Sequence, residues 1–215
     1  MADEPDTSPG IEPDVPDAAN VPAVPNVARI YDYFLGGHTH YPADIAAARR
    51  ITAASPQAPL LARAMRRWLV RVVAAMTAEG ITQFLDLGAD LHTLIDLTAP
   101  LGVIVSGVVH FLPETPATAA QFAALRERLA PGSALALNSL VSDGDPTGAT
   151  TLFRLYQGET GRGQLRTADQ LRRFFADFTL QRPGLVPLDD WRPDAPVPPS
   201  ALPEPLIWGG LARKP

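Results

Sequence analysis

The sequence predicts an α/β protein in which about five mostly parallel strands form a sheet with helices on both faces. Short apolar segments of strand length alternate with longer segments whose apolar residues recur at helical spacing. Residues 103–111 (VIVSGVVHF) are almost wholly apolar, as expected of a central parallel strand. Glycine and proline lie between the segments, where the chain must turn.

Three helices are expected before the first strand. Asn26 is a suitable cap for a helix that ends at Gly36, and Pro42 suits the first turn of a second helix. We expect these two helices, residues 26–57, to form an N-terminal lid. A longer helix over residues 58–78 carries one apolar stripe. We interpret its four arginines as a solvated face: Arg63, Arg66, Arg67 and Arg71.

The remaining elements follow from the same patterns. Strands are expected at residues 82–87, 103–111, 133–140, 178–182 and 205–212. Helices are expected at residues 118–129 and 168–177. Residues 144–164 are rich in glycine and polar side chains and predict a loop.

Composition restricts the compartment and the partners. With 215 residues, 46% of them apolar, the chain can build one core, which we assign to a single domain over residues 26–215. The absence of cysteine excludes disulfides and thiolate metal sites. Neither a secretory leader nor an apolar run long enough to span a bilayer is visible. We therefore expect a cytoplasmic protein with no membrane contact.

Charge is distributed unevenly along the chain. The first twenty residues contain six acids and no base, and many prolines, so residues 1–25 predict a disordered acidic tail. The rest of the chain carries 17 of the 23 acids against 18 bases, which leaves it almost neutral. A nucleic-acid-binding protein normally has a basic excess or stripe, so we expect no nucleic-acid partner.

Several segments together resemble a known family. They are residues 28–37 (ARIYDYFLGG), 41–44 (YPAD), 62–69 (ARAMRRWL), 80–88 (GITQFLDLG), 109–113 (VHFLP), 129–133 (LAPGS), 183–187 (PGLVP) and 191–194 (WRPD). In this order they resemble bacterial S-adenosylmethionine-dependent methyltransferase-like proteins, a domain of unknown function known mainly from bacteria rich in secondary metabolism. The resemblance implies a Rossmann-like methyltransferase fold with a cleft at the carboxyl ends of its strands.

The chain departs from this family at the cofactor motif. Asp86 and Gly88 are a remnant of that motif, but Asp90 stands where the family pattern leads us to expect glycine. Its carboxylate would repel the methionine carboxylate of the cofactor. The strand at 103–111 also follows so soon that two strands, their helices and the ribose-binding acid are expected to be absent. We therefore expect no cofactor, with S-adenosylmethionine as the alternative.

The four histidines belong to segments that this fold would bring near the cleft. The candidate catalytic residues are His110, Asp90, His92, Tyr33, His38 and His40. One interpretation is an acid–base pair, because histidine titrates near neutrality and aspartate can orient it. A second is a metal site built from His38, His40 and Asp90, and a third is that the histidines are structural or solvated. The residues expected to line a substrate pocket are Tyr31, Asp32, Gly36, Gly37, Tyr41 and Asp44.

Three functions remain open. The chain could be a non-methylating cyclase, isomerase or lyase that acts on a small, largely apolar metabolite. It could be a non-catalytic pseudoenzyme that binds a protein partner, or a second copy of itself, through the edge strand 82–87. It could also be a methyltransferase that another chain completes. An apolar edge strand is normally covered, so we expect something to cover residues 82–87.

Overall fold

A computed structural model describes residues 22–87, 95–160, 163–193 and 205–215. Six strands form one sheet in the order β1-β2-β3-β6-β4, and β5 also pairs with β6. They are β1 (Gln83–Asp86), β2 (Leu101–Ser106), β3 (Ala134–Leu140), β4 (Thr179–Leu180), β5 (Val186–Pro187) and β6 (Ile207–Arg213). The strands β1, β2 and β3 are parallel, whereas β6 is antiparallel to its neighbours. The predicted α/β class is confirmed.

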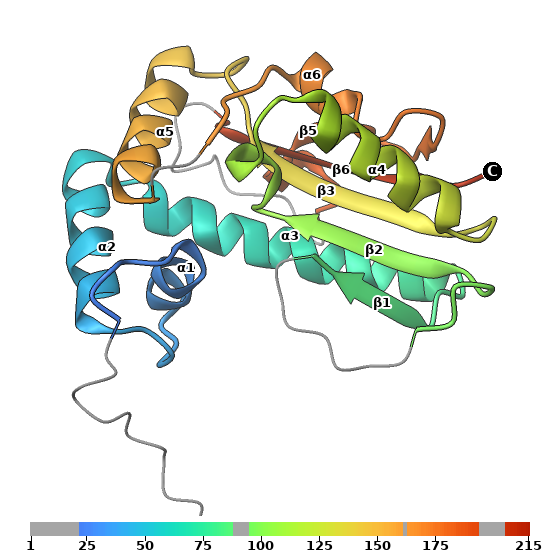
Figure 1. The fold of residues 1–215 in the computed structure, drawn as a ribbon, viewed down its shortest axis with the longest axis horizontal. Coiled ribbons are helices and arrows are strands. Elements are labelled where there is room, and N and C mark those ends of the chain that lie inside the picture. The colour runs from blue at the N-terminus through green and yellow to red at the C-terminus, as the bar shows by residue number, and fades with distance from the viewer. Residues whose placement is uncertain (1–21, 88–94, 161–162, 194–204) are drawn as a thin grey trace, which may run out of the picture.

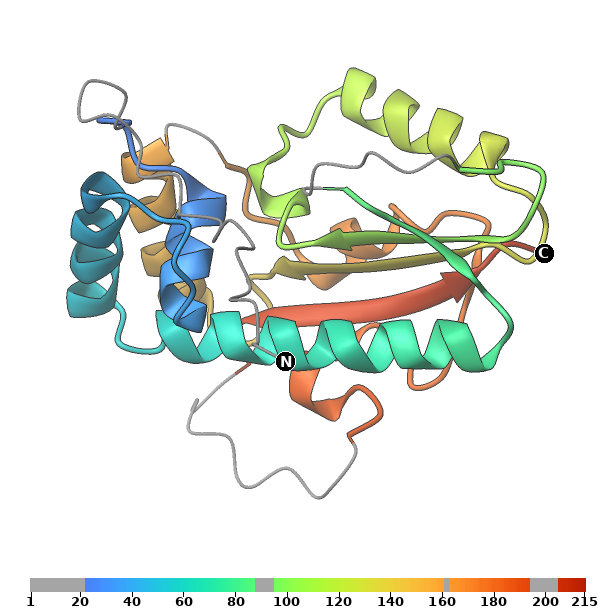
Figure 2. The same cartoon turned by 90° about the horizontal axis from the view of Figure 1, so that it is seen from below.

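Helices cover both faces and one end of the sheet. The long helix α3 (Ala58–Ala78) lies on one face, and α4 (Pro116–Arg128) lies on the other (Figure 2). The short helix α6 (Ala168–Arg172) shares the core beneath α4. The helices α1 (Val27–Leu35), α2 (Pro42–Ala54) and α5 (Pro146–Thr160) gather at the end toward which β1 and β2 point (Figure 1).

The sheet separates two apolar cores, because successive side chains of a strand point to opposite faces. On β2, Ile104 packs in the core of α3, together with Trp68. Its neighbours Val103 and Val105 pack in the core of α4, with Phe122. Burial on both faces explains why this strand reads as a continuous apolar run.

The first strand lies at the edge of the sheet, as the sequence predicts. Among the described strands, only β2 pairs with β1. Phe84 of β1 packs toward α3, where a Cβ on Gly102 would lie 2.7 Å from its ring and 3.1 Å from the sulfur of Met76. A glycine on β2 therefore allows the edge strand to approach α3 closely.

Two expected elements differ in the structure. Residues 103–111 are not one strand: β2 ends at Ser106, Gly107 has a φ of 69°, and a 3-10 turn, η2 (Val109–Phe111), follows. A positive φ is compatible with glycine and breaks the strand there. As a consequence, His110 lies on η2 instead of at a strand end.

The predicted loop at residues 144–164 is wrong, because most of it forms α5. Ala149 and Leu152 of this helix are buried in the core that α1, α2 and α3 share. Arg50 of α2 donates two hydrogen bonds of 2.8 Å to Glu159. Tertiary packing thus stabilises a helix whose glycines and threonines give it low intrinsic propensity. No helix of the described ranges combines the length and apolar character needed to cross a membrane.

Candidate functional site

A cavity of about 810 Å³ lies at the carboxyl ends of β1 and β2. Residues of α1, α3, α5 and η2 line it, and α1 and α5 lie at this end of the sheet (Figure 1). Much of the wall is apolar, with Leu61, Met65 and Leu69 contributed by α3. Ligands of parallel sheets bind at this end of the strands, and the volume is typical of a small-molecule site.

Three polar side chains meet the cavity from three different elements. Asp86 ends β1, Arg66 lies on α3 and Tyr31 lies on α1. Burial raises the pKa of the Asp86 carboxyl above its ordinary value, while the charge of Arg66 acts in the opposite direction. Burial also raises the pKa of Tyr31, with Arg66 lowering it and Asp86 raising it further. Asp86 therefore retains its proton to a higher pH than an exposed aspartate does.

His110 enters the same cavity from η2. Its Nδ1 lies 3.5 Å from the backbone nitrogen of Leu140 and 3.5 Å from the hydroxyl oxygen of Ser139. Because the Leu140 N–H donates to Nδ1, the ring proton belongs on Nε2. Burial lowers the pKa of His110 to about 4, and the charge of Arg166 contributes to the shift. The imidazole is therefore neutral at neutral pH.

Opposite pKa shifts in one apolar cavity are the arrangement that acid–base chemistry needs. A carboxyl group with a raised pKa binds a proton more readily than an exposed carboxyl does. A neutral imidazole can donate a hydrogen bond from Nε2 without carrying charge. Tyr156 of α5 adds a further ionisable group, and burial raises its pKa to about 12.

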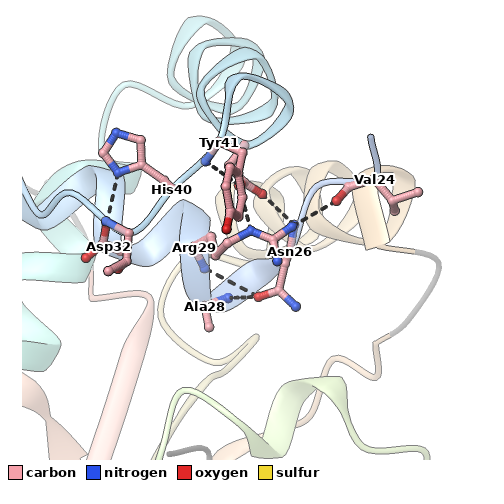
Figure 3. A network of polar contacts seen from close by, with 9 residues as sticks. Val24, Asn26, Ala28, Arg29, Asp32, His40 and Tyr41 are labelled. Carbon is pink, nitrogen blue, oxygen red and sulfur yellow. Dashed lines mark hydrogen bonds and ion pairs between the residues drawn. The ribbon is translucent and has the colours of Figure 1, made fainter. Parts of the chain in front are cut away.

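The signature residues of α1 and α2 form a separate polar network (Figure 3). The carboxylate of Asp44 is fully buried and accepts hydrogen bonds from the backbone nitrogens of Asn26 and Tyr41, both 2.8 Å long. Arg29 donates to it from Nε at 2.7 Å and to the carbonyl of Val24 from Nη2 at 3.0 Å. Burial alone would raise the pKa of Asp44, but these hydrogen bonds outweigh it and hold the pKa below its ordinary value. This network fastens the chain before α1 to the start of α2.

A second cluster closes the turn between α1 and α2. Asp32 accepts hydrogen bonds of 2.9 Å from the backbone nitrogen of Thr39 and from Nδ1 of His40, whose ring lies edge-on to Tyr33 (Figure 3). Burial would raise the pKa of Asp32, and the bonds from His40 and Thr39 lower it below its ordinary value. A Cβ on Gly37 would collide with the Asp32 carboxylate, so this position requires glycine.

The structure brings together only part of the predicted site. Among the predicted residues, Tyr31, Asp86 and His110 line the cavity. Eight others belong to α1, the following turn and the start of α2 and do not line it: Asp32, Tyr33, Gly36, Gly37, His38, His40, Tyr41 and Asp44. Gly88, Asp90 and His92 lie outside the described residues. His38 is exposed, and among the described residues no three potential metal ligands converge.

The sequence analysis missed Arg66 as a site residue. Its side chain is exposed, as expected of a solvated face, and it also lines the cavity. A signal was present, because Ala62, Met65, Arg66 and Leu69 stand at positions i, i+3, i+4 and i+7 and therefore share one helix face. Arg71, from the same predicted face, is half-buried and donates hydrogen bonds to the carbonyl oxygens of Leu188 and Trp191.

The described residues fit S-adenosylmethionine poorly at its ribose. In folds of this kind an acid at the end of a second strand, beside the first, holds the ribose hydroxyls. Here β1 is the edge, and no described strand lies on its outer side. Asp86 is the one acid of the described residues that lines the cavity, and it belongs to β1 itself.

Comparisons with known proteins identify the family. A family model described as S-adenosyl methyltransferase matches residues 18–94 and 89–215. A candidate methyltransferase from Thermobifida fusca YX aligns with 29% identity and a TM-score of 0.80, over 89% of this chain and 96% of its own. A DUF574 family protein from Streptomyces avermitilis MA-4680 aligns with 27% identity and a TM-score of 0.83, over 89% and 98%. No match is found among curated proteins. The chain belongs to the S-adenosyl methyltransferase family.

Proposed function

We propose that the chain binds a small, largely apolar molecule in the 810 Å³ cavity and catalyses a non-methylating acid–base step on it. The observation that carries this proposal is the pairing of Asp86, whose pKa is raised, with His110, whose pKa is lowered, in one largely apolar cavity. Proton transfer of this kind serves cyclisations, isomerisations and eliminations.

Each group has a defined part in such a step. When Asp86 is ionised, it accepts a proton from the substrate. When Asp86 is protonated, it returns a proton to the substrate. The Nε2–H of His110 donates a hydrogen bond to negative charge that develops on the substrate. Because the imidazole is neutral, this donor places no additional charge in the apolar cavity. Arg66 opposes the rise in the pKa of Asp86 and favours its ionised form, the form that accepts a proton.

Two observations favour a reaction without methyl transfer. The edge position of β1 leaves the described fold without the strand that carries the ribose-binding acid. The match to the family model is also divided, and its two parts meet at residues 89–94, the point where the sequence predicts a missing segment. Calorimetric titration with S-adenosylmethionine and S-adenosylhomocysteine tests this part directly. We expect no binding at millimolar cofactor, and micromolar binding would overturn it.

A chromogenic probe tests the acid–base part before the substrate is known. In 5-nitrobenzisoxazole a base removes one C–H proton, the N–O bond breaks, and a coloured nitrophenolate forms. We expect the protein to accelerate this elimination. We expect the rate to fall about a hundredfold in Asp86→Asn, because a positioned base is lost. The matched control is Asp96→Asn, since Asp96 is exposed and its carboxylate accepts hydrogen bonds from the backbone nitrogen and the hydroxyl of Thr98, away from the cavity. No rate above buffer, or equal rates in both variants, would contradict the proposal.

A second candidate function rests on the open edge of β1. An unpaired edge with the sequence QFLD lacks the lysine or proline that commonly protects edges. A protein partner or second copy that pairs with β1 would turn the chain into a binding module, or would complete a methyltransferase in trans. Phe84 packs inward against α3, so a charge there would disturb the fold. Leu97 is 50% exposed beside β1 and is the better probe.

Light scattering separates this candidate from a monomeric enzyme. If copies pair through β1, Leu97→Glu should shift the mass toward monomer, while Val70→Glu on the exposed side of α3 should not. A wild-type chain that is monomeric at all concentrations would exclude pairing between copies.

A further inference from the structure

A second cavity, of about 240 Å³, is lined by residues of α4 and α6, on the face of the sheet opposite α3. Three arginines line it: Arg126, Arg166 and Arg173. The rings of Phe122 and Phe174 also line it and meet edge-to-face, with centroids 4.7 Å apart. Its one acid is Glu114, so the cavity wall carries a net positive charge.

Arg166 is a buried cation, 2% exposed. Its Nη1 donates to the carbonyl of Val109 and its Nη2 to that of Leu112, both at 2.8 Å, and its guanidinium lies 5.3 Å from the centre of the Phe174 ring. Carbonyl oxygens accept these hydrogen bonds but carry no full negative charge. Within the described residues, no carboxylate forms an ion pair with Arg166. A buried charge of this kind is costly unless a counter-ion is close.

Arg126 adds a donor that the described residues do not satisfy. Its Nη1 donates to the carbonyl of Phe174, but its Nε is buried and has no hydrogen-bond partner. The carboxylate of Asp177 lies 3.6 Å from that Nε on a side chain that is 75% exposed. Arg126 therefore has a long ion pair with an exposed carboxylate but no hydrogen bond from Nε, so its charge is only partly balanced.

We propose that this cavity binds a small organic carboxylate with an apolar body, at a site separate from the cavity of Asp86 and His110. The guanidinium groups supply charge-assisted hydrogen bonds to the carboxylate. The two phenylalanine rings contact the apolar body, and the volume suits a molecule with one ring. Glu114 is exposed at the rim of the cavity, and its carboxylate competes with the bound carboxylate for the arginines.

Arg166 connects the two cavities. The carbonyls that it holds belong to Val109 and Leu112, which flank His110 along the chain. A carboxylate bound beside Arg166 changes the electrostatic potential and the side-chain packing at η2. Binding at this site should therefore be visible at the imidazole of His110, although His110 does not line the second cavity.

Benzoate is the probe, titrated at fixed ionic strength so that general screening stays constant. We expect saturable binding of one molecule, with the ring signals of His110 in the NMR spectrum shifting along the same curve. Arg173→Gln and Arg126→Gln should each weaken binding about fivefold or more, the loss expected for a charge-assisted hydrogen bond. Glu114→Gln should strengthen it by removing the competing carboxylate.

The same helices supply matched controls. Arg172 adjoins Arg173, and Arg128 lies two residues beyond Arg126, yet neither lines the cavity. Arg172→Gln and Arg128→Gln should leave benzoate affinity unchanged. Arg66→Gln should also leave it unchanged, which distinguishes this site from the larger cavity whatever the outcome of the elimination assay. The proposal is overturned if benzoate does not saturate, or if the control variants weaken binding as much as Arg173→Gln.

Discussion

Two aspartates in neighbouring regions of the molecule illustrate how differently the fold uses a buried carboxyl. Asp44, at the start of α2, accepts hydrogen bonds from two backbone nitrogens and a guanidinium, and its pKa is lowered. Asp86, at the end of β1, meets an apolar cavity, and its pKa is raised by burial. The hydrogen bonds to Asp44 outweigh the effect of its burial, so this carboxylate stabilises the fold. At Asp86 the effect of burial is not outweighed, and a carboxyl with a raised pKa is one that a reaction can use.

The contrast extends to the histidines of the two regions. His40 bonds to Asp32 and packs on Tyr33, so its surroundings are those of a structural residue in a turn. His110 has two 3.5 Å contacts at Nδ1, packs against the Phe111 ring and lines the cavity. The conspicuous signature YDYFLGG thus builds the helical end of the molecule, whereas the end of β1 and the turn η2 contribute the cavity residues Asp86 and His110.

The largest expected effect on stability comes from Asp44→Ala. Removing this carboxylate leaves Arg29 and two backbone nitrogens without their acceptor, so we expect the free energy of unfolding to fall by about 3 kcal/mol. Urea denaturation measures it. Asp189→Ala is the control, because its ion-pair partner Arg67 is 55% exposed and the pair should be worth less than about 1 kcal/mol. Equal losses in the two variants would contradict a structural role specific to Asp44.

A smaller effect is expected from the titration of His110. Its pKa is about 4 in the folded protein and about 6.5 in an unfolded chain, so the unfolded state binds the proton first as the pH falls. The stability that the neutral ring contributes is therefore complete above pH ~6.5 and is lost toward pH ~4. Between pH 7 and 4.5 the wild type should lose about 2 kcal/mol more than His110→Gln. Parallel pH profiles in urea denaturation would show that His110 is not buried as a neutral ring.

Patterning predicted the strands and the long helices well, because they are strongly apolar and end at clear breakers. The exceptions have local causes. The strand expected over residues 103–111 contains Gly107, whose positive φ cannot be inferred from apolar neighbours. The helix α5 has weak propensity and forms because Ala149 and Leu152 find a core that only the folded chain provides.

The site was predicted less well, because the sequence shows which residues are polar but not which of them are already satisfied. Asp32, His40 and Asp44 looked as available for chemistry as Asp86 did. Their partners come from capping and turn geometry that only the structure displays. Arg66 was overlooked because an arginine on a helix is usually solvated, and its place beside Met65 and Leu69 becomes informative only when that helix face lines a cavity.

The smallest effect is expected from Asp32→Asn, which sharpens the division between the two regions. The side chain is 25% exposed and its partner His40 is 16% exposed, so the asparagine keeps an acceptor for Thr39 and loses only charge. We expect a loss of about 0.5 kcal/mol in the free energy of unfolding. The rate of 5-nitrobenzisoxazole elimination should not change, because Asp32 does not line the cavity. A loss of rate comparable to that of Asp86→Asn, in a variant that stays folded, would place Asp32 within the reacting site and remove the distinction between a structural lid and a chemical cavity.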